Sequence, residues 1–255
     1  MLFLNLSPFV FVTCLTVLFF AGTVKGTLGM GLPLFAVPAL VSVFDLPTAI
    51  ALMMVPILVS NFLQVWRGKK KSESIKSLKR FFPLILTLIP FTVLTAQYIS
   101  KIDIKMGSII MGMIVILFSL SQLLTTKFYI SPKIEVFFSP LIGILAGILG
   151  GISSLIGPMI AMYLVSLKLQ KDLFVITIAI IFLFFSSTLY ITLIFSGTMN
   201  FTNITSSFLA SIPVMIGVVF GGKIRKKINQ KKFEIFLIFF LILIGLNLLR
   251  RGFFG

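Results

Sequence analysis

The sequence contains no histidine, a single cysteine and only six acidic residues among 255. The missing histidines exclude His-based metal sites and Cys–His dyads, and one cysteine excludes an intrachain disulfide. The six acids fall between or at the ends of apolar stretches, so the sequence offers no buried carboxylate for a proton relay or a hard-cation site. We therefore expect no catalytic residue, no metal site, no cofactor and no enzymatic activity.

Charge of either sign is scarce, because 11% of the residues are charged and 58% are hydrophobic. An ordinary globular chain has about 25% charged residues, and a helix that crosses a bilayer needs about 20 apolar residues. The sequence predicts an all-α, multi-pass protein of the cell's inner (plasma) membrane with about 8–10 membrane segments. The expected single spans are 48–66, 81–99, 106–126, 173–195, 204–222 and 233–249. Two longer regions, 8–44 and 134–167, each contain a Gly/Pro cluster and predict a broken helix pair.

The 22 basic residues give a formal net charge of +16. In a soluble domain this charge would suggest a nucleic-acid surface, but here the basic clusters lie between apolar spans, in the segments 67–80 and 223–232. Basic loops of membrane proteins stay on the cytoplasmic side, so we expect no nucleic-acid partner. Tracing the chain from these two loops places both termini outside. Four basic residues then fall outside and Lys25 falls in the membrane; the four are Lys101, Lys105, Arg250 and Arg251.

Two glycine clusters have the same spacing, Gly-x3-Gly-x2-Gly, and begin at Gly22 and Gly143. The offset between the clusters is constant at 121 residues, and Pro38 and Pro158 lie 120 residues apart. This pattern predicts an internal duplication, with residues 1–126 as the first repeat and 127–255 as the second. Each repeat would contain a broken pair and three helices, so the second repeat would enter the membrane from the opposite side. Inverted repeats are typical of secondary transporters whose substrate site lies near the bilayer midplane.

A single Gly-x3-Gly motif indicates close packing between membrane helices. Two copies, each joined to a proline within an apolar run, favour broken helices. A half-helix that begins inside the membrane presents backbone N–H groups and the positive end of its dipole, which together attract an anion. Pro33, Pro38 and Pro158 suit the first turn of such half-helices. The candidate substrate-binding glycines are Gly26, Gly29, Gly31, Gly147, Gly150 and Gly151.

Five polar side chains complete the candidate site: Lys25, Asn61, Ser153, Ser154 and Ser186. A buried lysine is normally retained for function, although Lys25 could instead extend to the headgroups if the helix breaks near Gly26. For the serines and Asn61, the alternative is a hydrogen bond to a carbonyl or to a neighbouring helix. We interpret Gln64, three residues after Asn61, as such an interhelical hydrogen bond.

With these motifs the chain resembles the sulfite exporter TauE/SafE family of membrane permeases. The resemblance rests on the segment Gly22–Gly31 with Pro38, and on Gly143–Gly151 with Gly157 and Pro158. It implies a protein that moves sulfite, organosulfonates or other small sulfur-containing anions across the membrane without ATP.

The sequence therefore predicts a secondary permease for a small anion that works by alternating access. The alternative is the membrane subunit of a larger ATP-driven transport complex. The sequence does not identify the anion, the coupling ion or the transport direction, and it does not decide between a monomer and a homodimer. It also leaves open whether the interrupted regions are full spans or re-entrant half-helices.

Overall fold

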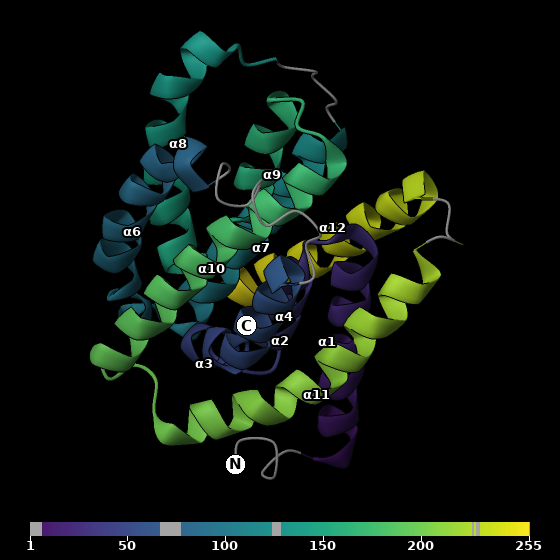
Figure 1. Cartoon of the computed structure of the whole chain (residues 1–255). Coiled ribbons are helices and arrows are strands. Elements are labelled where there is room, and N and C mark those ends of the chain that lie inside the picture. The colour runs from purple at the N-terminus through teal and green to yellow at the C-terminus, as the bar shows by residue number, and fades with distance from the viewer. Residues whose placement is uncertain (1–6, 67–77, 124–128, 226, 228–229, 255) are drawn as a thin grey trace. The chain divides into compact units, whose positions relative to one another are not determined.

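The computed structural model describes residues 7–66, 78–123, 129–225, 227 and 230–254. These residues form helices and contain no strand (Figure 1). Most of the predicted basic loop 67–80 and part of the loop 223–232 lie outside the described residues. The elements are α1 (Pro8–Leu28), α2 (Leu32–Val41), α3 (Leu46–Leu52), α4 (Met54–Trp66), α6 (Phe82–Ala96), η2 (Ile99–Lys101), α7 (Ile104–Leu123), α8 (Pro132–Ser153), α9 (Gly157–Ser166), α10 (Lys171–Phe195), α11 (Phe201–Ile224) and α12 (Gln230–Phe254).

Within the described residues, eight helical segments are long and apolar enough to cross a membrane. Six are single helices, one joins α6 to η2 as Phe82–Lys101, and one joins α3 to α4 as Leu46–Trp66. The shorter apolar helices α2 and α9 follow α1 and α8, as the two predicted broken pairs require. The prediction of an all-α, multi-pass membrane protein is therefore confirmed.

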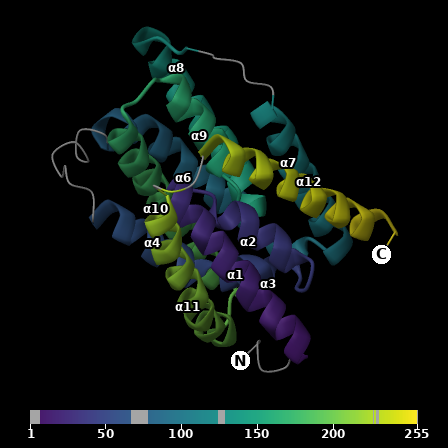
Figure 2. The same ribbon diagram turned by 90° about the vertical axis from the view of Figure 1, so that its right-hand side faces the viewer.

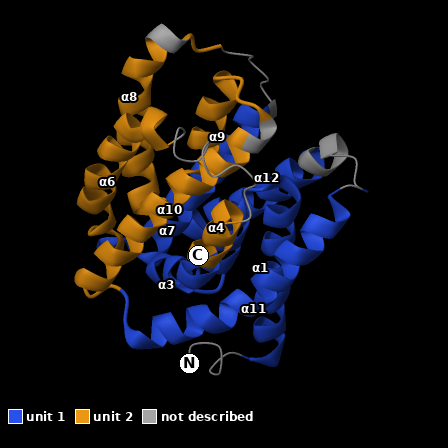
Figure 3. Ribbon diagram, in the orientation of Figure 1, with its two compact units in different colours: residues 1–56, 100–125, 199–255 blue, residues 57–99, 126–198 orange. Residues whose placement is uncertain are grey.

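The helices gather into two compact units (Figure 3). The first unit comprises residues 1–56, 100–125 and 199–255, and the second comprises 57–99 and 126–198. Each unit thus takes helices from both halves of the sequence. The predicted boundary at residue 126 concerns sequence equivalence, which compactness does not test, so the two-repeat division stays a prediction.

In the first unit, α1 packs along α11, and α7 packs along α12 (Figures 1 and 2). Glycines of α1 allow the closest approach: a Cβ atom added at Gly22 or Gly26 would fall within 3.0 Å of the backbone carbonyl of Val214 or Val218. Small residues let membrane helices approach backbone to backbone in this way. Gly22 and Gly26 are therefore packing positions within a continuous helix.

In the second unit, α6 packs along α8 in the corresponding manner (Figure 1). A Cβ atom added at Gly143 or Gly147 would meet the backbone carbonyl of Leu84 or Leu88 within 3.0 Å. The glycines of the two units are 121 residues apart, and the carbonyls that they face are 130 residues apart (214 − 84 and 218 − 88). The matched spacing thus extends from each glycine helix to its partner helix. The inversion of one half relative to the membrane stays a prediction.

An ion pair joins Arg80, two residues before α6 begins, to Glu135 in the first turn of α8. Arg80 Nε and Nη2 each donate to an oxygen of Glu135 over 2.7 Å. These hydrogen bonds raise the pKa of the Arg80 guanidinium above its usual value. Glu135 is 7% exposed, so the fork of the arginine neutralises an acid that has little contact with solvent.

The span Leu46–Trp66 is interrupted at Met53, between α3 and α4. Pro56 has no N–H, so the Leu52 carbonyl lacks its usual intrahelical donor. Ser207 of α11 replaces that donor: its Oγ donates to the Leu52 carbonyl and accepts from the Val55 N–H, each over 2.9 Å. One buried hydroxyl thereby satisfies both backbone groups that the interruption leaves open.

We expect Ser207→Ala to destabilise the protein by about 1–3 kcal/mol, because a buried carbonyl and a buried N–H would both lose their partner. The thermal unfolding midpoint of the purified protein in detergent measures the effect. Ser211→Ala is the matched control, since the Ser211 hydroxyl donates only to Phe208 of its own helix. Equal midpoints for the two variants would contradict the assigned role of Ser207.

Candidate functional site

The break between α1 and α2 consists of three residues, 29–31, in the first unit. Gly29 ends α1 in a left-handed conformation (φ 84°), and its N–H donates to the Lys25 carbonyl over 2.7 Å. Gly31 begins α2 with φ 97°. Residues with a side chain rarely adopt such positive φ angles, so both turns of the break favour glycine. Helix α1 ends at Leu28, so the break lies about one turn after Gly26, where the alternative interpretation of Lys25 placed it.

The N-terminus of α2 lies within protein. Leu32 is fully buried, and the N-cap Gly31 has no side chain to accept from the first N–H groups. Pro33 occupies the first turn, as predicted, whereas Pro38 lies inside α2 and the prediction of a first-turn role for it is wrong. A buried helix start without a side-chain cap leaves N–H donors and a positive dipole end for another acceptor.

Lys25 lies in the last turn of α1 and is 5% exposed. A lysine that extended to the headgroups would expose its ammonium, so this burial argues against the surface alternative. Its position at the negative end of the α1 dipole is electrostatically favourable for a cation. The structure thus places Lys25, Gly29 and Gly31 within one short stretch of the first unit, together with Gly26, which faces α11.

The break between α8 and α9 lies in the second unit and differs from the first by about one turn. The helix α8 continues through Gly147, Gly150 and Gly151 as far as Ser153. Ser154 then adopts the left-handed conformation (φ 64°), and its N–H donates to the Gly150 carbonyl over 2.6 Å. Pro158 is in the first turn of α9, as predicted. Since Ser154 carries a Cβ atom, its backbone conformation is strained by about 1–3 kcal/mol.

The glycines before this break face other parts of the second unit. Gly147 lies against Leu88 of α6, and Gly151 lies against Thr95 of the same helix. A Cβ atom at Gly150 would collide with Ile156, which follows the break, and with Phe185 of α10. These contacts explain each glycine by close packing, and their predicted contact with substrate stays a prediction.

The two serines of the break have different surroundings. Ser153 Oγ donates to the Leu149 carbonyl over 2.6 Å and accepts from the Leu155 N–H over 3.1 Å. Ser153 therefore satisfies the broken backbone, as the alternative interpretation held. Ser154 is 1% exposed, and its hydroxyl makes no hydrogen bond within the described part of the chain. A buried hydroxyl in that state is available to a ligand.

Tyr190 of α10 is a candidate residue that the sequence analysis missed. It is 1% exposed, and its hydroxyl lies within interaction range of Ser154. Ser186 precedes it by one turn and donates to the Phe182 carbonyl over 2.6 Å, so that hydroxyl is already used within α10. The available signal was the Ser-x3-Tyr spacing, which places Ser186 and Tyr190 one turn apart on the same face of α10.

Asn61 and Gln64 lie on α4, also in the second unit. Asn61 is 2% exposed. Gln64 Nε2 donates to the Val175 carbonyl of α10 over 3.0 Å, which confirms the interpretation of Gln64 as an interhelical contact. The structure thus assigns the seven remaining predicted site residues to the second unit: Asn61, Gly147, Gly150, Gly151, Ser153, Ser154 and Ser186.

Across the described residues, no three His, Cys, Asp or Glu side chains gather in a way that could hold a metal ion. The chemistry that the two breaks offer is instead that of hydrogen-bond donors: backbone N–H groups, one ammonium and two hydroxyls. Groups of this kind suit an anion.

No curated protein and no solved structure gives a significant match to this chain. A family model described as sulfite exporter TauE/SafE matches residues 14–248, nearly the whole sequence. This family implies membrane transport of sulfite or a related sulfur-containing anion rather than an enzymatic reaction. The chain belongs to the sulfite exporter TauE/SafE family.

Proposed function

We propose that the protein is a secondary permease that moves sulfite, an organosulfonate or another small sulfur-containing anion through the membrane by alternating access. Two half-helices, α2 and α9, provide the main structural support, because each begins at a break and has no side-chain cap. Such helix starts bind anions through backbone N–H groups and the helix dipole. Membership of the family supports the class of substrate.

The two breaks, each considered within its own unit, differ in the groups that they offer to an anion. The first unit supplies the Lys25 ammonium and the start of α2, which favour an anion by charge. The second unit supplies the hydroxyls of Ser154 and Tyr190, which favour an anion by directed hydrogen bonds. Sulfite and sulfonate groups present several acceptor oxygens, and charge-assisted hydrogen bonds to such oxygens are stronger than neutral ones.

The alternative, a membrane subunit of an ATP-driven complex, differs in what the isolated chain can do. We expect the purified chain, reconstituted alone in proteoliposomes, to carry sulfite down an imposed concentration gradient without ATP. Protein-free liposomes give the background leak, and a panel of sulfonates, thiosulfate and carboxylates defines the substrate class. Absence of flux for every anion, under imposed pH and sodium gradients as well, would favour the ATP-driven alternative.

Lys25→Met should weaken the apparent affinity for the transported anion at least tenfold, which corresponds to about 1.4 kcal/mol. The reason is the loss of the Lys25 ammonium from the last turn of α1, just before the α1–α2 break. Membrane abundance and the thermal unfolding midpoint of the variant are measured alongside affinity, so that a loss of folded protein is not taken for a loss of binding. The matched control is Lys223→Met, which removes an exposed lysine from the last turn of α11. Unchanged affinity in the Lys25 variant would assign this lysine to the α1 dipole alone.

Tyr190→Phe and Ser154→Gly each remove one buried hydroxyl, and we expect each to lower anion affinity about tenfold. Ser154→Gly also relieves the positive φ, so its unfolding midpoint should stay equal or rise. The combination of weaker binding with retained stability is not expected of a merely structural residue. Tyr129→Phe, at an exposed tyrosine, is the control. Wild-type affinity in both variants would remove these hydroxyls from the site.

A further inference from the structure

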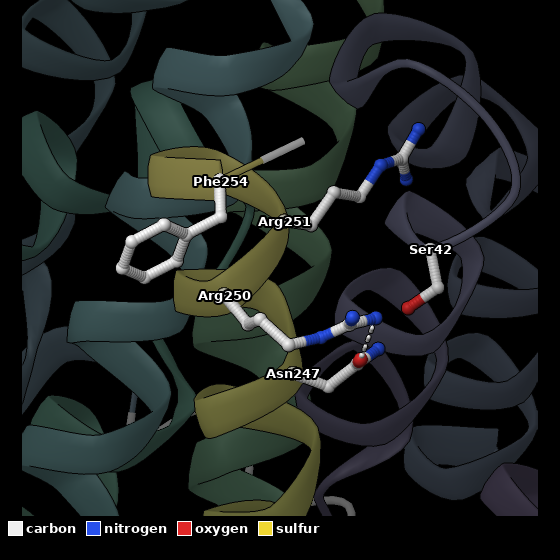
Figure 4. Close-up of a pocket in the computed structure, with 5 residues that line it drawn as sticks. All are labelled: Ser42, Asn247, Arg250, Arg251 and Phe254. Atoms are coloured by element: carbon white, nitrogen blue, oxygen red, sulfur yellow. Dashed lines mark hydrogen bonds between the residues drawn. The ribbon is translucent and has the colours of Figure 1, made fainter.

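A small pocket lies in the first unit, where the last turn of α12 meets the end of α2 (Figure 4). Its volume is about 200 Å³, which is smaller than the roughly 300 Å³ at which pockets for drug-sized ligands begin. Figure 4 shows the side chains of Arg250, Asn247 and Ser42 directed toward one another. A ligand of this pocket is therefore small and meets several polar groups. The lining residues are Ser42, Asn247, Arg250, Arg251 and Phe254.

Two arginines hold this pocket in shape. Arg251 Nη1 donates to the Val41 carbonyl at the end of α2, which ties α12 to α2. Arg250 Nη2 donates to Asn247 Oδ1 over 3.3 Å. Each guanidinium has five N–H donors in a fixed fork, so each of these bonds occupies only one of the five. The remaining donors suit the oxygens of a tetrahedral anion.

The carboxylates on the neighbouring segments have other roles. Asp45 accepts from the Thr48 N–H over 3.3 Å, and Asp103 accepts from the Met106 N–H over 2.6 Å, so each caps a helix. Among the described residues, no carboxylate lies within 4.0 Å of Arg250 or Arg251. The positive charge of this pair is therefore not neutralised by a partner in that part of the protein.

The pocket adjoins some of the four basic residues that the predicted topology places outside, on the side where basic residues are uncommon. The four basic residues predicted outside the membrane belong to the end of η2, the start of α7 and the end of α12. The last two of these segments touch, because a Cβ atom at Gly252 would lie 3.0 Å from the Lys105 carbonyl. The predicted topology places these residues on the side where basic residues are disfavoured, and an anionic partner would balance Arg250 and Arg251 there. The four are Lys101, Lys105, Arg250 and Arg251.

Two exposed phenylalanines adjoin the arginines. Phe253 is 64% exposed and Phe254 is 88% exposed. Arginines at the end of an apolar span extend to the membrane interface, and α12 ends in two arginines followed by these exposed apolar rings. The pocket is then at the level where lipid phosphates are found.

We propose that the pocket between α2 and α12 binds a phosphate group, carried by an anionic lipid headgroup or by free phosphate. Arg250 and Arg251 bind the phosphate oxygens through their guanidinium forks. The Ser42 hydroxyl and the Asn247 amide supply further hydrogen bonds from the two sides of the pocket. This site is separate from the two breaks and does not depend on the transported substrate.

The test compares the full chain with the double variant Arg250→Gln/Arg251→Gln in neutral phosphatidylcholine nanodiscs. Titration with phosphatidylglycerol, followed by native mass spectrometry of the retained lipid, should show at least tenfold weaker binding in the double variant. The control is Arg225→Gln, which replaces an arginine at the C-cap of α11 and should bind the lipid like the wild type. In a second arm, inorganic phosphate is titrated into lipid-free detergent samples and the unfolding midpoint is measured.

The two arms separate the sources of the phosphate group. An Arg-dependent response to phosphatidylglycerol alone assigns the pocket to a lipid, and an Arg-dependent rise of the midpoint with inorganic phosphate assigns it to a free anion. If the double variant does not fold, Arg250→Lys replaces it, because a lysine keeps the charge but loses the fork and should bind less tightly than the wild type. Equal responses of wild type and variant in both arms would overturn the proposal.

Discussion

The backbone of a membrane protein must satisfy its own hydrogen bonds, because the bilayer core holds no water that could replace a missing partner. This constraint governs every interruption in the described helices. At Met53 the hydroxyl of Ser207 supplies the missing donor and acceptor. At the α1–α2 break the Gly29 N–H returns to Lys25, and at the α8–α9 break Ser153 bonds both neighbouring backbone groups. At each interruption a specific residue thus satisfies part of the broken backbone, while the starts of α2 and α9 have no side-chain cap.

The glycine clusters serve two purposes, close helix packing and interruption of a helix, which cannot be told apart from the spacing of the glycines alone. Their first members, such as Gly22 and Gly143, lie within continuous helices and bring the backbones of α11 and α6 close. In the first unit the last members, Gly29 and Gly31, form the break itself through positive φ angles. The same sequence pattern therefore contains packing glycines and, in the first unit, the glycines of the break itself.

The sequence predicted the helical spans well, because about 20 consecutive apolar residues leave few alternatives in a bilayer. It also predicted that regions 8–44 and 134–167 are broken. The residue at which each helix breaks was harder to predict, because glycine is tolerated inside a packed membrane helix and does not by itself mark a helix end. Hence Pro38 lies inside α2, and Ser154, rather than a glycine, takes the left-handed position after α8. Tyr190 escaped notice because a tyrosine in an apolar helix is ordinary until its burial beside Ser154 is seen.

The two breaks satisfy the same constraint with different chemistry. The first uses glycines without strain and carries a buried ammonium, whereas the second accepts a strained Ser154 and carries neutral hydroxyls. Strain of about 1–3 kcal/mol persists only where the surroundings enforce it or where function maintains it. A glycine at position 154 would remove that strain but also the hydroxyl. Under the proposed function, the serine at position 154 places a hydroxyl at the second break, which a glycine would not supply.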